Sequence, residues 1–309
     1  MRVKDCILLL VLVASILMGT LLPATGAIFQ PHLKFFIMGL LFLSFLGIRI
    51  SEVWLVLHQA WLRIAVLSVL KIIVLPVAVY FVFAALGSPF AMGALLLTGV
   101  STGVVAPFIS NLVGGNTPLV LAVVVFTSLA TPFSLPALVD ILAGRSFDLP
   151  LDNMVIMLSE VIFIPLIAVE ALRRILPGLV AGLHRRGYPL SLTLFAVINL
   201  GVFSRYADFF RQQPAVIINA VLVAMLLGLV YLVVGLASSW NSQAGDSLAS
   251  AVSLSNVNNV LVIVFASQFF GPLESTLAAM YMFPFFAVII PLRLFKSWKD
   301  RSILAPGKA

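Results

Sequence analysis

Charged residues are scarce in this sequence. Asp, Glu, Lys and Arg make up 9% of its 309 residues, whereas they make up about a quarter of an average soluble domain. Hydrophobic residues make up 62%, and the mean hydropathy is +1.20. So little charge excludes a soluble fold, and the apolar runs of about twenty residues indicate an all-α polytopic membrane protein. Any function is therefore carried out within or across the lipid bilayer.

The sequence also lacks the residues of metal and disulfide chemistry. Cys6 is its single cysteine, which excludes an internal disulfide. His32, His58 and His184 are scattered near the ends of apolar runs without the spacing of metal ligands. We therefore expect no metal site and no cofactor.

The arrangements of several membrane enzymes are missing as well. An aspartyl protease needs two carboxylates at mid-depth, and Asp246 has no such companion. A membrane serine protease needs a histidine at the depth of its serine, and no histidine lies deep in an apolar run. A phosphate-binding Gly-rich loop with a following Lys is absent. We do not expect an enzyme.

Basic residues exceed acidic ones, giving a net charge of +7. They lie at the ends of apolar runs, where they orient a membrane protein, so we expect no nucleic-acid partner. Arg2 and Lys4 before an apolar run fit either a signal peptide or a first spanning helix. Cys6 to Leu22 is longer than the roughly 7 to 15 residues of a signal's apolar region, which favours a helix broken by Pro23.

Ten spans are predicted, all bounded by Gly, Pro or charge. They are 6–25, 33–50, 61–85, 90–112, 117–142, 153–175, 189–206, 214–239, 246–269 and 275–295. The side of both termini then receives 13 basic residues: Arg2, Lys4, Arg49, Arg63, Arg173, Arg174, Arg185, Arg186, Arg293, Lys296, Lys299, Arg301 and Lys308. The other side receives 4: Lys34, Arg145, Arg205 and Arg211. This count predicts cytoplasmic termini.

The joint of Arg145 to Asp152 divides the chain nearly in half. Two halves of five spans are expected of inverted repeats, because an odd number of helices forces opposite orientations. We therefore predict one transporter unit over residues 1–309, with repeats at 1–145 and 150–298 and a cytoplasmic tail at 299–309.

The fourth and ninth spans contain the polar residues and helix breakers that predict interrupted helices. The fourth carries Ser101, Thr102, Gly103 and Pro107, and the ninth carries Ser253, Ser255, Asn256, Asn258 and Asn259. Such clusters are costly against lipid and indicate a polar cavity or a broken helix, although ordinary bonding between helices is an alternative. Paired broken helices point to a transporter site, and their half-helix N-termini suit an anion.

Lys71 lies about seven residues inside an apolar run that begins at Ile64, hence roughly 10 Å deep. A lysine at this depth indicates function, whereas a snorkelling side chain would have no role. Glu160 lies at comparable depth and is either its partner or faces interfacial water.

Several motifs together resemble the bacterial bile acid:sodium symporter family. They are Met38 to Gly47, Lys71 to Pro76, Gly103 to Pro107, Gly115-Asn116, Thr131-Pro132 and Ser255-Asn256, and the resemblance covers roughly residues 10–295. It implies ten helices in two inverted repeats of five. Spans 1, 2, 6 and 7 would form a panel, and spans 4 and 9 would break and cross in a core. Family members carry bile acids, pantoate-like acids and other amphipathic carboxylates.

The sequence departs from this family at its sodium ligands. Aligning the helix 9 motif places Ala251 at a family glutamate, and Lys71 stands at a family glutamine. An ungapped count from Gly115-Asn116 places Pro107 and Val120 at two further ligand positions. Because sodium needs several oxygen ligands, we hypothesise that the Lys71 ammonium replaces it, bonding carbonyls of the crossing and Asn256 or Asn258.

The resulting prediction is a sodium-independent secondary transporter of a small organic anion in a bacterial inner membrane. It is uncoupled if Lys71 stays protonated and proton-coupled if Lys71 releases its proton in one facing state. Two alternatives are a sodium-coupled symporter, with ligands from Ser253, Ser255 and Asn256, and a non-transporting receptor or scaffold that keeps the fold.

Overall fold

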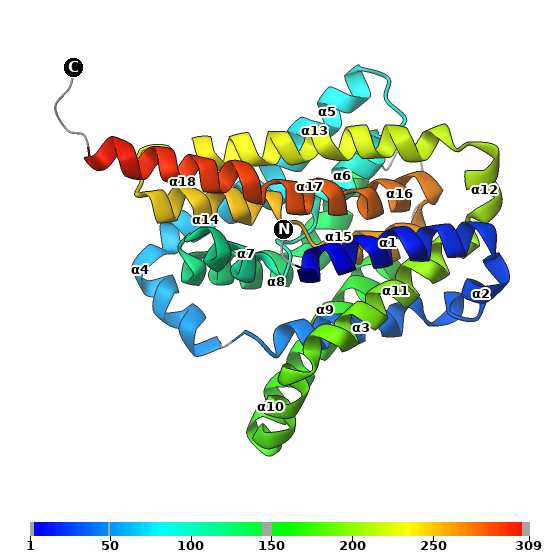
Figure 1. The fold of residues 1–309 in the computed structure, drawn as a ribbon, viewed down its shortest axis with the longest axis horizontal. Coiled ribbons are helices and arrows are strands. Elements are labelled where there is room, and N and C mark those ends of the chain that lie inside the picture. The colour runs from blue at the N-terminus through cyan, green and yellow to red at the C-terminus, as the bar shows by residue number, and fades with distance from the viewer. Residues whose placement is uncertain (1–2, 49, 144–149, 305–309) are drawn as a thin grey trace.

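The computed structural model describes residues 3–48, 50–143 and 150–304. These residues form helices, with no strand among them (Figure 1). Several predictions lie outside the described residues: the placement of Arg2, Arg49, Arg145 and Lys308, the end of the first repeat at 145, and the tail beyond 304.

Seven helical stretches are long and apolar enough to cross a membrane, which indicates an integral membrane protein. They are Pro23–Phe45, Val56–Ala85, Thr117–Leu142, Leu151–Ile175, Gly187–Arg205, Ala215–Ala237 and Pro272–Asp300. Each overlaps one of the ten predicted spans. The all-helical membrane class predicted from composition is therefore confirmed.

Shorter helices occupy the other three predicted spans. The span at 6–25 is α1 (Val3–Leu21) followed by α2 (Pro23–Ala27), with the expected break at Pro23. The span at 90–112 is divided into α6 (Ala91–Gly99) and α7 (Ala106–Val113). The span at 246–269 is divided into α14 (Ala244–Ser255) and α15 (Asn259–Phe269). Both predicted interruptions are confirmed.

The span that carries Lys71 is irregular at two points. Helix α4 (Ile50–Val69) has a non-helical residue at Ala60, with φ −138°, just before the predicted start at 61. A π-helical turn, η2 (Leu70–Val74), then leads into α5 (Leu75–Ala85). Pro76 lacks an N–H and its ring crowds the carbonyl four residues before it. A wider turn at this point relieves that crowding, and π-helical turns are frequent at functional sites.

The remaining elements complete the bundle of Figure 1. They are η1 (Gln30–His32), α3 (Leu33–Phe45), α8 (Thr117–Ala143), α9 (Leu151–Ile175), α10 (Pro177–Arg185), α11 (Gly187–Arg205), α12 (Ala207–Gln212), α13 (Ala215–Ala237), α16 (Pro272–Met280), α17 (Met282–Ala287) and α18 (Ile289–Leu304). Helix α10 projects from the bundle at the turn between α9 and α11 (Figure 1).

The helices pack as two groups. In the first, which we call the panel, α11 packs against α1 and α3, and α3 packs against α9. In the second, the core, α5 packs on α6, α13 on α14, and α16 on both α13 and α15. The panel and the core meet along α8 and α9 and where α15 touches α3 and α11.

Small residues allow the closest approach between core helices. A Cβ on Gly235 of α13 would lie 2.5 Å from Ala251 Cα and 3.0 Å from its backbone nitrogen in α14. The two backbones touch here, so an added carbon would force the helices apart. Without an intervening side chain, α13 can support α14 just before its interruption.

We predict that Gly235→Ala lowers the melting temperature of the detergent-solubilised protein, because overpacking costs about 1–3 kcal/mol. Gly182→Ala is the matched control, since a Cβ on Gly182 meets nothing within 4 Å. Alanine has a higher helix propensity than glycine, by up to about 1 kcal/mol. The Gly182→Ala variant should therefore melt at the wild-type temperature or above it. Equal effects of the two substitutions would contradict close contact of α13 with α14.

Candidate functional site at the crossing of two interrupted helices

The two interrupted helices meet through their extended segments. The Gly103 N–H donates to the Asn256 carbonyl at 2.6 Å, and the Asn258 N–H donates to the Ser101 carbonyl at 3.0 Å. Thr102 and Val257 thereby form an isolated antiparallel bridge. The bridge satisfies backbone groups that the broken helices leave free, which is required in a setting without water.

Local sequence explains why the first helix breaks here. Pro107 lies in the first turn of α7, where a missing N–H costs nothing, and it disfavours a helix running through from α6. Gly103 supplies the space for the crossing, because a Cβ there would lie 2.9 Å from the Val257 carbonyl oxygen. Pro107 therefore interrupts the helix, and Gly103 leaves room for the backbone of the second interrupted helix.

Hydroxyl groups bond the carbonyls at the end of α14. The Thr102 hydroxyl donates to the Ser253 carbonyl at 2.7 Å, and the Tyr281 hydroxyl donates to the Ser255 carbonyl at 2.6 Å. The Ser255 hydroxyl turns back to the Ala251 carbonyl at 2.7 Å. The last carbonyls of a helix carry its negative dipole end, and here protein donors reach two of them.

A lysine bonds the corresponding end of α6. Lys71 is fully buried, and its Nζ donates to the Thr98 carbonyl at 2.9 Å. Nζ also lies 5.5 Å from the centre of the Tyr231 ring, within the range of a cation–π contact. The Tyr231 hydroxyl is hydrogen-bonded to the Thr98 hydroxyl. Among the residues whose burial is described, Lys71 is the only buried Asp, Glu, Lys or Arg.

The crossing lacks two of the sodium ligands that the resemblance implies. Ala251 and Val120, which replace family ligands in the resemblance, are both fully buried side chains without oxygen. Within the described part of the chain, no group of three or more His, Cys, Asp or Glu residues could hold a metal. Three helix-end carbonyls at the crossing accept hydrogen bonds from Lys71, Thr102 and Tyr281. The hydroxyls of Ser101 and Ser253 and the side-chain oxygen of Asn256 are buried there without a hydrogen-bond partner.

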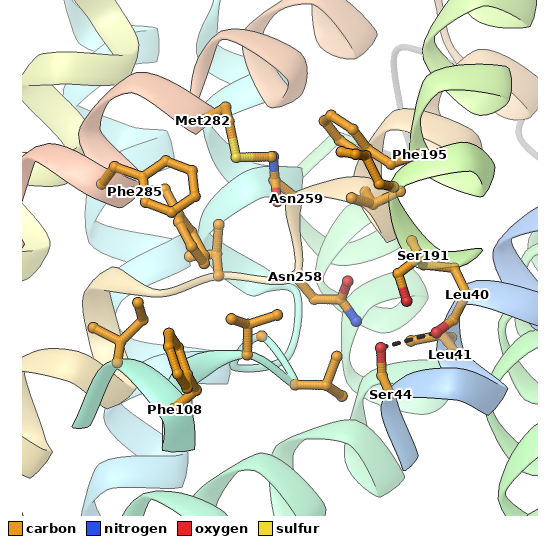
Figure 2. A pocket seen from close by; sticks show the side chains of 18 of the residues that line it. Leu40, Leu41, Ser44, Phe108, Ser191, Phe195, Asn258, Asn259, Met282 and Phe285 are labelled. Atoms are coloured by element: carbon orange, nitrogen blue, oxygen red, sulfur yellow. Dashed lines mark hydrogen bonds between the residues drawn. The ribbon is translucent and has the colours of Figure 1, made fainter. Parts of the chain in front are cut away.

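A cavity of about 600 Å³ lies between the crossing and the panel. Its lining is apolar except for a few side chains, and no Asp, Glu, Lys, Arg or His lines it. Figure 2 shows Asn258 directed from the crossing toward Ser44 of α3 and Ser191 of α11, while Phe108 and Phe285 lie on the other side. The cavity therefore has one polar end and a larger apolar part.

The half-helix α15 begins at this cavity. Asn258 stands at its N-cap position, yet makes no side-chain capping hydrogen bond, although asparagine is among the best caps. Its side chain is 8% exposed and lines the cavity together with Asn259 and Val260. The first turn of α15 therefore faces the cavity, where its N–H groups and positive dipole end favour an anion.

The cavity lies toward one end of the bundle, and a hydrogen bond joins panel and core at the opposite end. Ser44 lies near the end of α3 and Ser191 near the start of α11, beside the basic stretch 173–186. At the other end, the Tyr206 hydroxyl donates to the Ser267 carbonyl of α15 at 3.1 Å. The basic-residue count predicts that the end holding the cavity is cytoplasmic.

The structure brings most of the predicted site residues together. Ser101, Thr102, Ser253, Ser255 and Asn256 are fully buried at the crossing, and half-buried Pro107 follows it. Gly103, Asn258 and Asn259 line the cavity. The Asn256 amide donates to the Phe285 carbonyl at 3.4 Å and the Asn259 amide to the Ala278 carbonyl at 3.2 Å.

Asn116 belongs to a different place. It lies in the turn before α8, where its amide donates to the Asp246 carboxylate at 2.8 Å and its oxygen caps the Leu119 N–H at 3.2 Å. Asp246 is also paired with Arg63. Asn116 was predicted to be a site residue together with those of the crossing, whereas here it ties the start of α8 to the start of α14.

Two expectations about Lys71 also need correction. Glu160 is not its partner, because Glu160 of α9 is paired with Lys34 of α3 inside the panel. Lys71 is bonded to the Thr98 carbonyl, and no hydrogen bond joins it to Asn256 or Asn258. Both errors arise because depth in a span does not tell toward which neighbouring helix a side chain points.

Sequence reasoning missed the tyrosines and serines that complete the site. Tyr231 and Tyr281 are fully buried, with ring centres 5.8 Å apart, and a buried tyrosine usually has a hydrogen-bond partner for its hydroxyl. Two tyrosines deep in apolar spans were therefore an available signal. Ser44 and Ser191 carried no comparable signal, because isolated serines are common in membrane helices.

Comparison with known proteins adds no identification. No protein-family model matches the chain, and no curated protein matches it significantly.

Accessibility of the cavity can be tested by cysteine labelling in a Cys6→Ser background. We predict that a membrane-impermeant maleimide labels Ser191→Cys from the cytoplasmic face, because Ser191 lines the cavity. Thr131→Cys is the control and should stay unlabelled, because Thr131 is fully buried. Labelling of both positions, or of neither, would contradict an open cavity at this end.

Proposed function

We propose that the protein is a sodium-independent secondary transporter that carries a small organic anion across the membrane by alternating access. The observation that carries this proposal is the position of Lys71, fully buried and bonded to the end of α6 beside the crossing. An ammonium there is a monovalent cation fixed to the protein, so no dissolved cation is needed to balance the helix ends.

The cavity supports an amphipathic carboxylate as substrate. Its apolar part suits a hydrocarbon body, and its volume of about 600 Å³ lies within the range of small-molecule sites. Asn258 and the first turn of α15 offer hydrogen-bond donors to a carboxylate without adding a positive side chain. The attraction is modest enough to permit release, which a carrier requires.

The arrangement of helices supports the same mechanism. The panel of α1, α3, α9 and α11 faces a core with two interrupted helices, as the resemblance to the bile acid:sodium symporter family implies. We extend the proposal to ten spans in two inverted repeats and to cytoplasmic termini in a bacterial inner membrane. The cavity would then be open to the cytoplasm.

We further propose that Lys71 keeps its proton throughout the cycle, which makes the carrier a facilitator or exchanger. Lys71 does not line the cavity, so its amine does not meet water or substrate there. The Thr98 carbonyl and the face of the Tyr231 ring support a positive charge on it.

The proposal is tested by uptake of radiolabelled cholate and pantoate into proteoliposomes. We expect flux of at least one probe that is unchanged by replacing sodium with potassium and by a pH gradient. Lys71→Gln should lower this flux at least tenfold or make it depend on sodium, because the helix ends lose their cation. Lys34→Gln is the control, since Lys34 bonds Glu160 away from the crossing.

A stimulation of wild-type flux by a sodium gradient would contradict the proposal. So would the absence of flux in protein that binds these carboxylates in a thermal-shift screen, because a receptor binds without transporting.

A further inference from the structure

The positive charge of Lys71 is fixed to the structural unit that forms the substrate site. Its Nζ bonds the Thr98 carbonyl one turn before the crossing. The backbone then continues through Gly99 to Ser101. The Ser101 carbonyl accepts a hydrogen bond from the backbone N–H of Asn258. Asn258 lines the cavity. One short chain of bonds therefore connects the lysine to the wall that contacts a substrate.

This connection is rigid because the surrounding packing is tight. A Cβ on Gly99 would lie 2.9 Å from Leu135 Cδ1 and 3.5 Å from Pro76 Cβ, so α6 is held closely between α8 and α5. Lys71 itself has no exposed surface. The ammonium therefore cannot change its depth independently of the crossing.

Alternating access changes where this unit lies in the membrane field. The cavity has the panel on one wall and the crossing on the other, and the bond from Tyr206 to Ser267 joins panel and core at the opposite end. Opening the other end transfers the voltage drop from one side of the crossing to the other. The charge of Lys71 crosses part of that field each time, whichever group of helices moves.

We propose that Lys71 carries one positive charge through the membrane field with the substrate site, so that the site loaded with a monoanion moves no net charge and the empty site moves one positive charge. This inference rests on the proposed function. It commits the substrate to a single negative charge and assigns the voltage-dependent step to the return of the empty carrier.

Other charges near the core do not cancel this movement. Asp246 and Arg63 form an ion pair, as do Glu160 and Lys34, so each pair moves no net charge. Glu274 lies in the first turn of α16, where it accepts a hydrogen bond from the Gly271 N–H at 3.1 Å. It lies at the end of the bundle where α15 turns into α16, away from the middle of the field.

The sign of the charge determines the direction of transport. A membrane potential that is negative inside draws the empty, positive site toward the cytoplasm. One charge that crosses the whole field changes the equilibrium about 50-fold at 100 mV. The carrier would then rest with its cavity open to the cytoplasm and release a monoanion outward.

The first test needs no substrate. Voltage jumps applied to the purified protein in a planar bilayer, without sodium or carboxylate, should produce a transient charge movement that saturates at about one elementary charge per carrier or less. We expect Lys71→Gln to abolish this movement and Lys71→Arg to retain it. The control Glu274→Gln should leave it unchanged. No movement in the wild type, or an unchanged movement in a folded Lys71→Gln variant, would overturn the inference.

The second test uses the wild-type chain and therefore stands if Lys71→Gln fails to fold. In proteoliposomes, exchange of cholate for cholate should be insensitive to an imposed potential, whereas net cholate efflux should be accelerated by a negative interior. Equal voltage dependence of exchange and net efflux would overturn the inference while leaving the proposed transport intact. Failure of both probes to cross in the flux assay would instead refute the proposed transport function.

Discussion

The structure depends on how the carbonyl ends of two half-helices are stabilised inside a membrane. Two helices that stop in mid-bilayer each present a negative dipole end where no water can solvate it. Here the ends receive donors from the protein: the Lys71 ammonium at Thr98, and the Thr102 and Tyr281 hydroxyls at Ser253 and Ser255. The donor at α6 is an amine, and in the proposed function its positive charge takes the place of a bound cation.

The same crossing also shapes the cavity. With its carbonyl ends bonded on the buried side, the opposite ends of the interruption, the first turns of α7 and α15, face the cavity. The crossing therefore has a different electrostatic character on each of its two sides. Positive charge is held behind the crossing, and an anion is favoured in front of it by helix N-termini and the Asn258 amide. Because Lys71 does not line the cavity, the proposed anion would feel its charge only at a distance.

The features predicted correctly from sequence were those that a short segment determines. Pro107 and Gly103 specify the break in span 4, and the Ser and Asn cluster at 253–259 specifies the break in span 9. What could not be predicted depends on neighbours distant in sequence. The π-helical turn at 70–74 sets the direction of Lys71, the Tyr231 ring comes from α13, and Ser44 and Ser191 meet Asn258 only after the panel has packed. Asn116 was misplaced for the same reason.

The central claim is that a protonated Lys71 amine bonds the end of α6. The most direct measurement is solid-state NMR of the protein in lipid, with nitrogen-15 at lysine Nζ and carbon-13 at threonine carbonyls, and with Lys71→Arg to assign the signal. We predict a Lys71 resonance at the ammonium shift that is dipolar-coupled to the Thr98 carbonyl. A neutral-amine shift, or an ammonium signal without coupling to Thr98, would contradict the account.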